Sequence, residues 1–277
     1  MDLSKVVDLS LILKHSANAT GGGGIVIPPS PYFVLCEGDS LTAAEAFGPP
    51  DTSYPKYLRD ALSSNYTLHN DGTSGEESSQ VLAQAYDLHD TYFSEYYSAN
   101  IVVVMIGTND LFFDRTEQSI KDNIELICGR YRAWGWRVIV GTITKSNLIT
   151  VGNGREAIRQ NVNAWILANY TTFADGLVDK AARSEFSDPL NSAYFSDGTH
   201  YTIAAAQLIA SMTYTVVTSM TSLSLTSPGR IAGCKAWFRP DPSMVAASGG
   251  ICTWIGDRSG NITAGAEQVS GSAPAWV

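Results

Sequence analysis

The 277-residue sequence is poor in cysteine, with 4 Cys in all. None of them stands in a C-x-x-C spacing, which excludes a zinc knuckle and a thioredoxin-type site. Cys36 and Cys128 lie in apolar stretches and are expected to be buried free thiols. Cys234 and Cys252 could instead pair as a disulfide in an oxidising compartment.

Charge is also scarce, because Asp, Glu, Lys and Arg make up 16% of the residues. The 18 basic residues form no run, and 27 acidic residues bring the formal net charge to -9. Phosphate binding needs clustered Lys and Arg, so nucleic acid is excluded as the main partner. A hydrophobic content of 44% fits a folded core and excludes disorder throughout.

Long apolar runs are missing as well. No stretch reaches the roughly 18 apolar residues that span a bilayer, which predicts a soluble protein without a transmembrane segment. A signal peptide needs an unbroken apolar region behind a positively charged start. The apolar cluster at 6–13 is interrupted by Asp8, and the residues before it carry no net positive charge because they hold one Lys and one Asp. We expect an amphipathic helix or strand there, with secretion as the alternative; the sequence assigns no compartment.

Glycine and proline instead mark the domain organisation. The run at 21–24 is all glycine, and prolines follow at 28, 29 and 31. Since no Lys-Ser/Thr follows the glycines, they do not form a P-loop. We expect an N-terminal extension and linker over 1–31, a main domain over 32–220, and a linker with a short β appendage over 221–277.

Within the main domain, short apolar runs alternate with segments of helical periodicity. Strands are predicted from residue 32 and at 66–70, 100–106, 137–143 and 176–179; helices are predicted at 53–62, 76–97, 117–134, 155–170 and 200–217. This alternation predicts an α/β domain with a parallel sheet covered on both faces. Three strands end in small polar clusters, at Ser40, Gly75 and Asn109, and such ends meet at one edge of the sheet.

Ser40 is a candidate nucleophile because it directly follows the first apolar strand. A helical turn after the strand would place free N–H groups near it, which favours negative charge. Gly38-Asp39-Ser40 is also ordinary turn chemistry, and a serine attacks only where a base is within reach.

His200 is the candidate base among the 4 histidines. Asp197 precedes it by three residues, so one loop supplies both an imidazole and a carboxylate. Asp197 could equally cap the last helix. We expect structural or solvated roles for His15, His69 and His89.

Gly75 and Asn109 are candidate donors for the oxyanion that forms in acyl transfer, through a backbone N–H and a side-chain amide. Asn109 also fits a plain turn. Phe112 and Phe113, just after Asn109, either line a substrate pocket or belong to the core.

Four ordered blocks carry a resemblance to a known family. They are Gly38-Asp39-Ser40-Leu41, Asn70-Asp71-Gly72-Thr73-Ser74-Gly75, Gly107-Thr108-Asn109-Asp110 and Asp197-Gly198-Thr199-His200. In this order and spacing they resemble the SGNH hydrolases, the GDSL esterase/lipase family.

The resemblance implies a three-layer α/β/α, flavodoxin-like domain that needs no metal and no cofactor. It implies a catalytic triad of nucleophile Ser40, base His200 and its partner Asp197. The oxyanion hole would comprise the Ser40 N–H, Gly75 and Asn109, with Gly75 preferred to Gly72 because it follows Ser74. Asp39 is too close to Ser40 to orient His200 and is expected to shape the turn.

The expected function is a serine esterase that hydrolyses short-chain or carbohydrate-linked acetyl esters through an acyl-enzyme. The partner is then a small-molecule or glycan-linked ester, and the oligomeric state is open. One alternative is acyl transfer to a sugar or alcohol acceptor. Another is a non-catalytic glycan-binding or structural module of a larger, phage-type protein, because the segments at 231–241 and 254–261 resemble the opening of concanavalin-like (laminin-G-like) domains.

Overall fold

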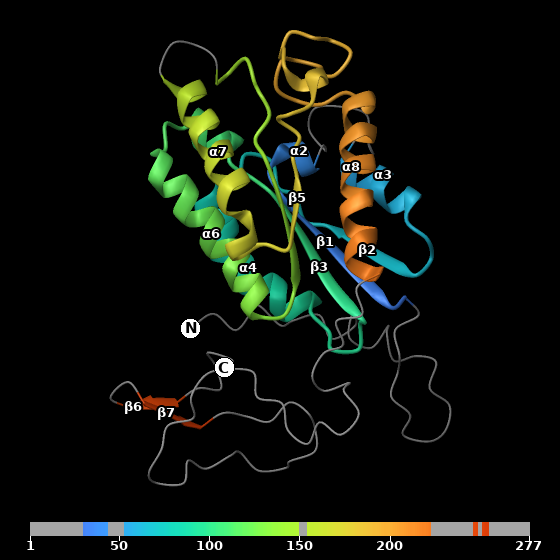
Figure 1. Cartoon of the computed structure of the whole chain (residues 1–277), viewed down its shortest axis with the longest axis vertical. Coiled ribbons are helices and arrows are strands. Elements are labelled where there is room, and N and C mark those ends of the chain that lie inside the picture. Colours follow the sequence, from blue (N-terminus) through green and yellow to red (C-terminus); the bar gives the residue numbers. More distant parts are fainter. Residues whose placement is uncertain (1–29, 44–52, 150–153, 223–245, 249–250, 255–277) are drawn as a thin grey trace, which may run out of the picture.

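The computed structural model describes residues 30–43, 53–149, 154–222, 246–248 and 251–254. Its centre is a parallel sheet with the strand order β2-β1-β3-β4-β5 (Figure 1). The strands are β1 (Tyr32–Gly38), β2 (Tyr66–Asn70), β3 (Ala99–Met105), β4 (Arg137–Gly141) and β5 (Gly176–Val178). The predicted α/β fold with a parallel sheet is confirmed.

Helices cover both faces of this sheet (Figure 1). One face carries α4 (Ser78–Tyr92), α6 (Glu117–Ala133) and α7 (Arg155–Phe173); the other carries α3 (Tyr54–Ala61) and α8 (Ile203–Ser222). Two short helices, α2 (Ser40–Ala43) and α5 (Thr108–Phe112), follow β1 and β3, and a 3₁₀ turn, η1 (Ser184–Phe186), follows β5.

The alternation of side chains along the strands explains why two layers of helices are needed. Every residue of β3 is buried. Val102 and Val104 pack into the core beneath α4, α6 and α7, whereas Ile101 and Val103 pack into the core beneath α3 and α8. A strand that is apolar on both faces is stable only when both faces are covered.

Some predicted helix ends differ from the structure. The second helix was expected to reach residue 97 but ends at Tyr92, where the Phe93 N–H bonds to the His89 carbonyl. The last helix was expected to end at about residue 217 but runs to Ser222, so it continues into the first residues of the expected linker. There the Thr218 hydroxyl donates to the Tyr214 carbonyl one turn back, which satisfies the hydroxyl without ending the helix.

α8 is also long and apolar enough to cross a membrane by length and composition, over Ile203–Thr221 with a mean hydropathy of 1.3. Its residues Ala206, Ile209 and Val217 are buried against the sheet. Core helices of this kind meet the same criterion, so the helix is not evidence of a membrane span.

An antiparallel pair, β6 (Ala246–Ser248) and β7 (Ile251–Trp254), stands near the C-terminus. The N-terminal extension up to residue 29, Cys234 and the remainder of the C-terminal appendage lie outside the described residues. The same holds for the proposed Cys234–Cys252 disulfide, His15 and most of the segments that resemble a concanavalin-like domain.

Candidate active site

The carboxyl ends of the parallel strands gather the predicted residues at one edge of the sheet. Ser40 is the first residue of α2 directly after β1, Gly75 follows β2, and Asn109 lies on α5 directly after β3. β1 lies between β2 and β3, so the three segments are neighbours. His200 comes from the loop that leads into α8, which begins at Ile203.

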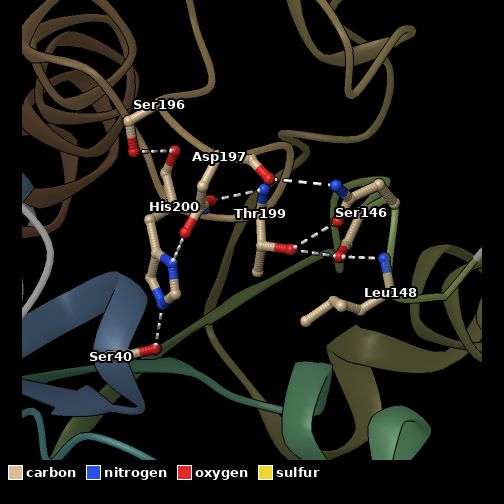
Figure 2. Close-up of polar contacts among 8 residues, drawn as sticks. Ser40, Ser146, Leu148, Ser196, Asp197, Thr199 and His200 are labelled. Atoms are coloured by element: carbon tan, nitrogen blue, oxygen red, sulfur yellow. Dashed lines mark hydrogen bonds and ion pairs between the residues drawn. The ribbon is translucent and has the colours of Figure 1, made fainter.

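Ser40, His200 and Asp197 form a continuous hydrogen-bonded chain (Figure 2). Ser40 Oγ lies 3.1 Å from His200 Nε2, and His200 Nδ1 lies 2.7 Å from Asp197 Oδ2. An ionised carboxylate only accepts, so Nδ1 carries a proton in this contact. In the neutral ring Nε2 is then free to accept the Ser40 proton.

Asp197 also organises the backbone of its own loop. Its Oδ1 accepts the N–H groups of Thr199 and His200, at 2.9 and 2.7 Å. Burial alone would raise the pKa of Asp197, but the hydrogen bonds from the His200 ring and from these N–H groups outweigh burial and lower the pKa below its ordinary value. The carboxylate therefore stays ionised at neutral pH, as the His200 contact requires.

A second loop, after β4, braces the loop that carries Asp197 and His200 (Figure 2). The Asn147 N–H donates to the Gly198 carbonyl at 2.9 Å, and the Asn147 amide donates to the Asp197 carbonyl at 2.9 Å. The hydroxyls of Ser146 and Thr199 lie 2.6 Å apart. These bonds fix where the imidazole stands relative to Ser40.

The two glycines considered as oxyanion donors differ in their surroundings. The Gly72 N–H already donates to Asn70 Oδ1 at 3.1 Å, and a Cβ on Gly72 would lie 2.4 Å from the Ala43 nitrogen. Gly75 has no atom of the described residues within 4 Å of the place of a Cβ, and its N–H has no acceptor among them. The preference for Gly75 therefore agrees with a free N–H in open space.

Asn109 is anchored to the segment that contains Gly75. Its Nδ2 donates one hydrogen to the Glu76 carbonyl at 2.8 Å, which leaves the second amide hydrogen available. The next residue, Asp110, is buried and accepts the N–H and hydroxyl of Ser78, at 2.9 and 2.5 Å. α5 and the start of α4 are thus tied together, and Asn109 is held against the segment that directly follows Gly75.

Phe112 and Phe113 are surface residues, with 38% and 48% of their area exposed. Their rings meet edge to face with centroids 5.0 Å apart. The Arg155 guanidinium lies 5.5 Å from the Phe112 ring and bonds both to Asp114 and to the Leu148 carbonyl. The alternative that these phenylalanines belong to the core is wrong.

The other described histidines make structural contacts. His89 is buried and its Nδ1 accepts the Trp136 indole N–H at 3.0 Å, while His69 contacts the Tyr92 hydroxyl at 2.8 Å. The expected turn role of Asp39 is confirmed, because its Oδ1 accepts the Leu41 N–H at 2.9 Å.

Two buried charged residues near the site were not identified from the sequence. Glu37 on β1 is fully buried, and burial raises its pKa well above the ordinary value. Lys180, two residues past β5, is buried with its charge acting on Asp39. The sequence does offer a signal for Glu37, because it is the one ionisable residue in an otherwise apolar strand. The residues around Lys180 offer no such signal.

Comparison with known proteins places these motifs in a family. The model of the GDSL-like Lipase/Acylhydrolase family matches residues 36–208, more than half of the chain, and its span includes all four blocks. The chain belongs to this family. GDSL-like hydrolases are serine ester hydrolases, and so is this protein.

Solved structures agree on the fold. A lipolytic protein of the G-D-S-L family from Veillonella parvula is 18% identical, with a TM-score of 0.58 over 68% of this chain and 98% of that chain. The psychrotrophic esterase EstA from Pseudoalteromonas sp. is 20% identical, with a TM-score of 0.55 over 69% and 98%. TesA is 19% identical, with a TM-score of 0.55 over 68% and 99%. No curated protein sequence matches significantly.

Proposed function

We propose that this GDSL-like hydrolase cleaves short-chain carboxylic esters, including acetyl esters of carbohydrates, through an acyl-enzyme on Ser40. The observation that carries the proposal is the chain from Ser40 Oγ through the His200 ring to Asp197, with contacts of 3.1 and 2.7 Å. A serine hydroxyl becomes nucleophilic when a positioned base accepts its proton, and the base in turn needs an orienting partner.

In the first half of the reaction, Ser40 Oγ attacks the ester carbonyl carbon as His200 Nε2 takes the hydroxyl proton. The carbonyl π electrons move onto oxygen, and Asp197 stabilises the imidazolium. The Ser40 N–H, the Gly75 N–H and the second Asn109 amide hydrogen are the proposed donors to the oxyanion. Collapse of the intermediate breaks the bond to the alkoxy oxygen, which leaves as the alcohol with the proton from His200.

In the second half, water replaces the alcohol. His200 removes a proton from water, the hydroxide adds to the acyl carbon, and the same donors hold the second oxyanion. Collapse breaks the bond to Ser40 Oγ, which regains its proton from His200 as the acid is released. The cycle consumes only ester and water, so the residues of this chain suffice for it.

Phe112 and Phe113 are proposed to contact the acyl or alcohol group. They lie on and just after the short helix that carries Asn109, and they expose ring surface. The preference for short acyl groups rests on the sequence, because the segments between the four blocks contain no long apolar stretch that would form a lid. Two exposed rings suit a small acyl group or a sugar face better than a long chain.

Hydrolysis of a p-nitrophenyl ester series from acetate to palmitate tests the proposal. We expect the highest kcat/KM on the shortest esters, no measurable turnover for Ser40→Ala, and unchanged turnover for Ser211→Ala on the exposed side of α8. EstA is described as inhibited by monoethylphosphonate. We accordingly expect a phosphonate to modify Ser40. Mass spectrometry of the peptide that contains Ser40 would detect this modification. An optimum at palmitate would contradict the short-chain preference, and activity in Ser40→Ala would contradict the nucleophile.

A further inference from the structure

The chain leaves the sheet after β4 at Ile143, whose backbone groups are buried. The register of β4 against β5 ends with Gly141 opposite Val178, so Ile143 lies beyond the paired residues. Its side chain packs at the start of α5, where a Cβ on Gly107 would lie 2.6 Å from Ile143 Cδ1. Because Ile143 is only 2% exposed, its N–H and carbonyl need partners other than water and the neighbouring strand.

Asn163 on α7 pairs with both of these backbone groups. Its Oδ1 accepts the Ile143 N–H at 2.8 Å, and its Nδ2 donates to the Ile143 carbonyl at 2.8 Å. A side-chain amide offers a donor and an acceptor, as a peptide group does, so one side chain can satisfy both. Asn163 is itself buried, and loss of its amide would leave the Ile143 N–H without a partner in the interior.

Arg159, one turn earlier on the same face of α7, binds the same carbonyl. Its Nη1 donates to the Ile143 carbonyl at 2.8 Å. Its Nε and Nη2 donate to the two carboxylate oxygens of Glu156, each at 2.7 Å, and this fork fixes the plane of the guanidinium. Like Asn163, Arg159 is buried, so two polar side chains of α7 hold the first part of the loop after β4.

The other side of this loop contacts the loop that carries Asp197 and His200 (Figure 2). Three residues of the loop after β4 make these contacts, which are those of Thr144 with Tyr201, of Ser146 with Thr199 and of Asn147 with Asp197, at 2.8, 2.6 and 2.9 Å. At its far end, Arg155 on α7 donates to the Leu148 carbonyl at 3.0 Å. The loop is therefore held between α7 and the loop of the catalytic base.

α7 does not need these polar contacts to stay on the sheet. Its apolar side chains Val162, Ile166 and Phe173 are buried in the core on that face. Burial of such side chains is the main source of stability for a packed helix. What Asn163 and Arg159 add is the position of the loop after β4.

We propose that Asn163 and Arg159 are positioning residues for His200. They hold the loop after β4, and that loop holds the His200 ring at the place where Nε2 lies 3.1 Å from Ser40 Oγ. Both side chains are buried and act through this loop, not through contact with the substrate. The proposal rests on Ser40 as the nucleophile of the proposed esterase.

Asn163→Leu and Arg159→Lys test this role. Asn163→Leu removes both bonds to Ile143 at a similar side-chain volume. We expect kcat on p-nitrophenyl acetate to fall about 10- to 100-fold with KM nearly unchanged, because a displacement of about 1 Å at the reacting groups has an effect of this size. Arg159→Lys keeps the positive charge but not the fork of donors, and we expect a loss of about three- to tenfold.

¹⁵N NMR of the His200 ring reports its position without any substrate. In both variants the Nε2 resonance should move toward that of an imidazole without a hydroxyl partner. The Nδ1 resonance should stay, because Nδ1 bonds to Asp197 within the same loop. Asn169→Leu is the matched control on α7: it removes an amide bond to the Trp165 carbonyl of 2.9 Å and should keep kcat and both resonances.

The outcomes separate this proposal from the proposed function. If Asn163→Leu does not fold, Arg159→Lys carries the same two measurements. Folded variants with the kcat and the Nε2 resonance of the wild type would overturn the positioning role, whether or not the wild type hydrolyses the esters. A shifted Nε2 resonance in the variants of a wild type that hydrolyses no ester of the series would contradict the esterase function alone.

Discussion

At the scale of single residues, Asp197 uses its two oxygens for different purposes. Oδ2 holds the His200 ring and Oδ1 holds the loop backbone. Asp197→Asn keeps an oxygen for the backbone but presents an NH₂ group to Nδ1, which favours the wrong tautomer of His200. We expect kcat to fall about a thousandfold with little change in melting temperature. Kinetics on p-nitrophenyl acetate measure the loss. A loss below tenfold would leave Asp197 with its contacts to the loop backbone as its only role.

Asn109 allows a similar separation of chemistry from structure. Asn109→Ala removes a proposed oxyanion donor, and kcat should fall about 10²- to 10³-fold with KM nearly unchanged. The matched control is Asn100→Ala at the start of β3, where the amide donates to the Ser94 carbonyl at 2.8 Å, as Asn109 does to Glu76. Asn100→Ala should lower the melting temperature and retain kcat. Equal kcat losses in the two variants would refute the oxyanion role.

At the scale of elements, the loop that carries Asp197 and His200 depends on a glycine. Gly198 has φ of 86°, and a Cβ there would lie 2.2 Å from Asn147 Nδ2. Gly198→Ala should therefore push away the loop after β4 and displace His200, with a loss of kcat/KM of about a hundredfold or more.

Gly154→Ala is the matched control for this prediction. Gly154 has φ of 83° but no atom within 4 Å of the place of a Cβ among the described residues. Gly154→Ala should therefore lose only the free energy needed to hold an alanine in a left-handed conformation. The free energy of unfolding should fall by about 1 kcal/mol and the activity should not change. Urea unfolding and kinetics on both variants separate the two effects, and an active Gly198→Ala would contradict the bracing role of Asn147.

The elements also show which features a sequence reveals. Apolar strands that stop at Gly, Asp, Ser or Asn are local signals, so the sheet and the residues at its edge could be predicted. The end of α8 could not, because the Thr218 hydroxyl bonds back to the helix instead of breaking it. Lys180 could not either, because it is buried against Gly141, a segment remote from it in sequence.

At the scale of the whole molecule, the buried charges beside the site oppose folding. The pKa of Asp39 is raised to about 6, so its ionisation in the native state costs stability as pH rises from about 4 to 6. The pKa of Lys180 is lowered to about 8, so stability returns only as pH rises from about 8 to 10. Between about pH 6 and 8 both groups are charged in the folded protein, and both lower the free energy of unfolding.

Replacing both groups by uncharged residues of similar shape should therefore stabilise the fold. We expect Asp39→Asn/Lys180→Met to be about 1–4 kcal/mol more stable than the wild type at neutral pH, because ionising either buried group costs stability in the folded protein. The margin should shrink below about pH 5 and above about pH 9, because one of the two groups is then neutral in the wild type as well. Urea unfolding at three pH values measures the margin. A double variant less stable than the wild type at neutral pH would contradict this expectation, because it would show that the two buried groups stabilise the fold.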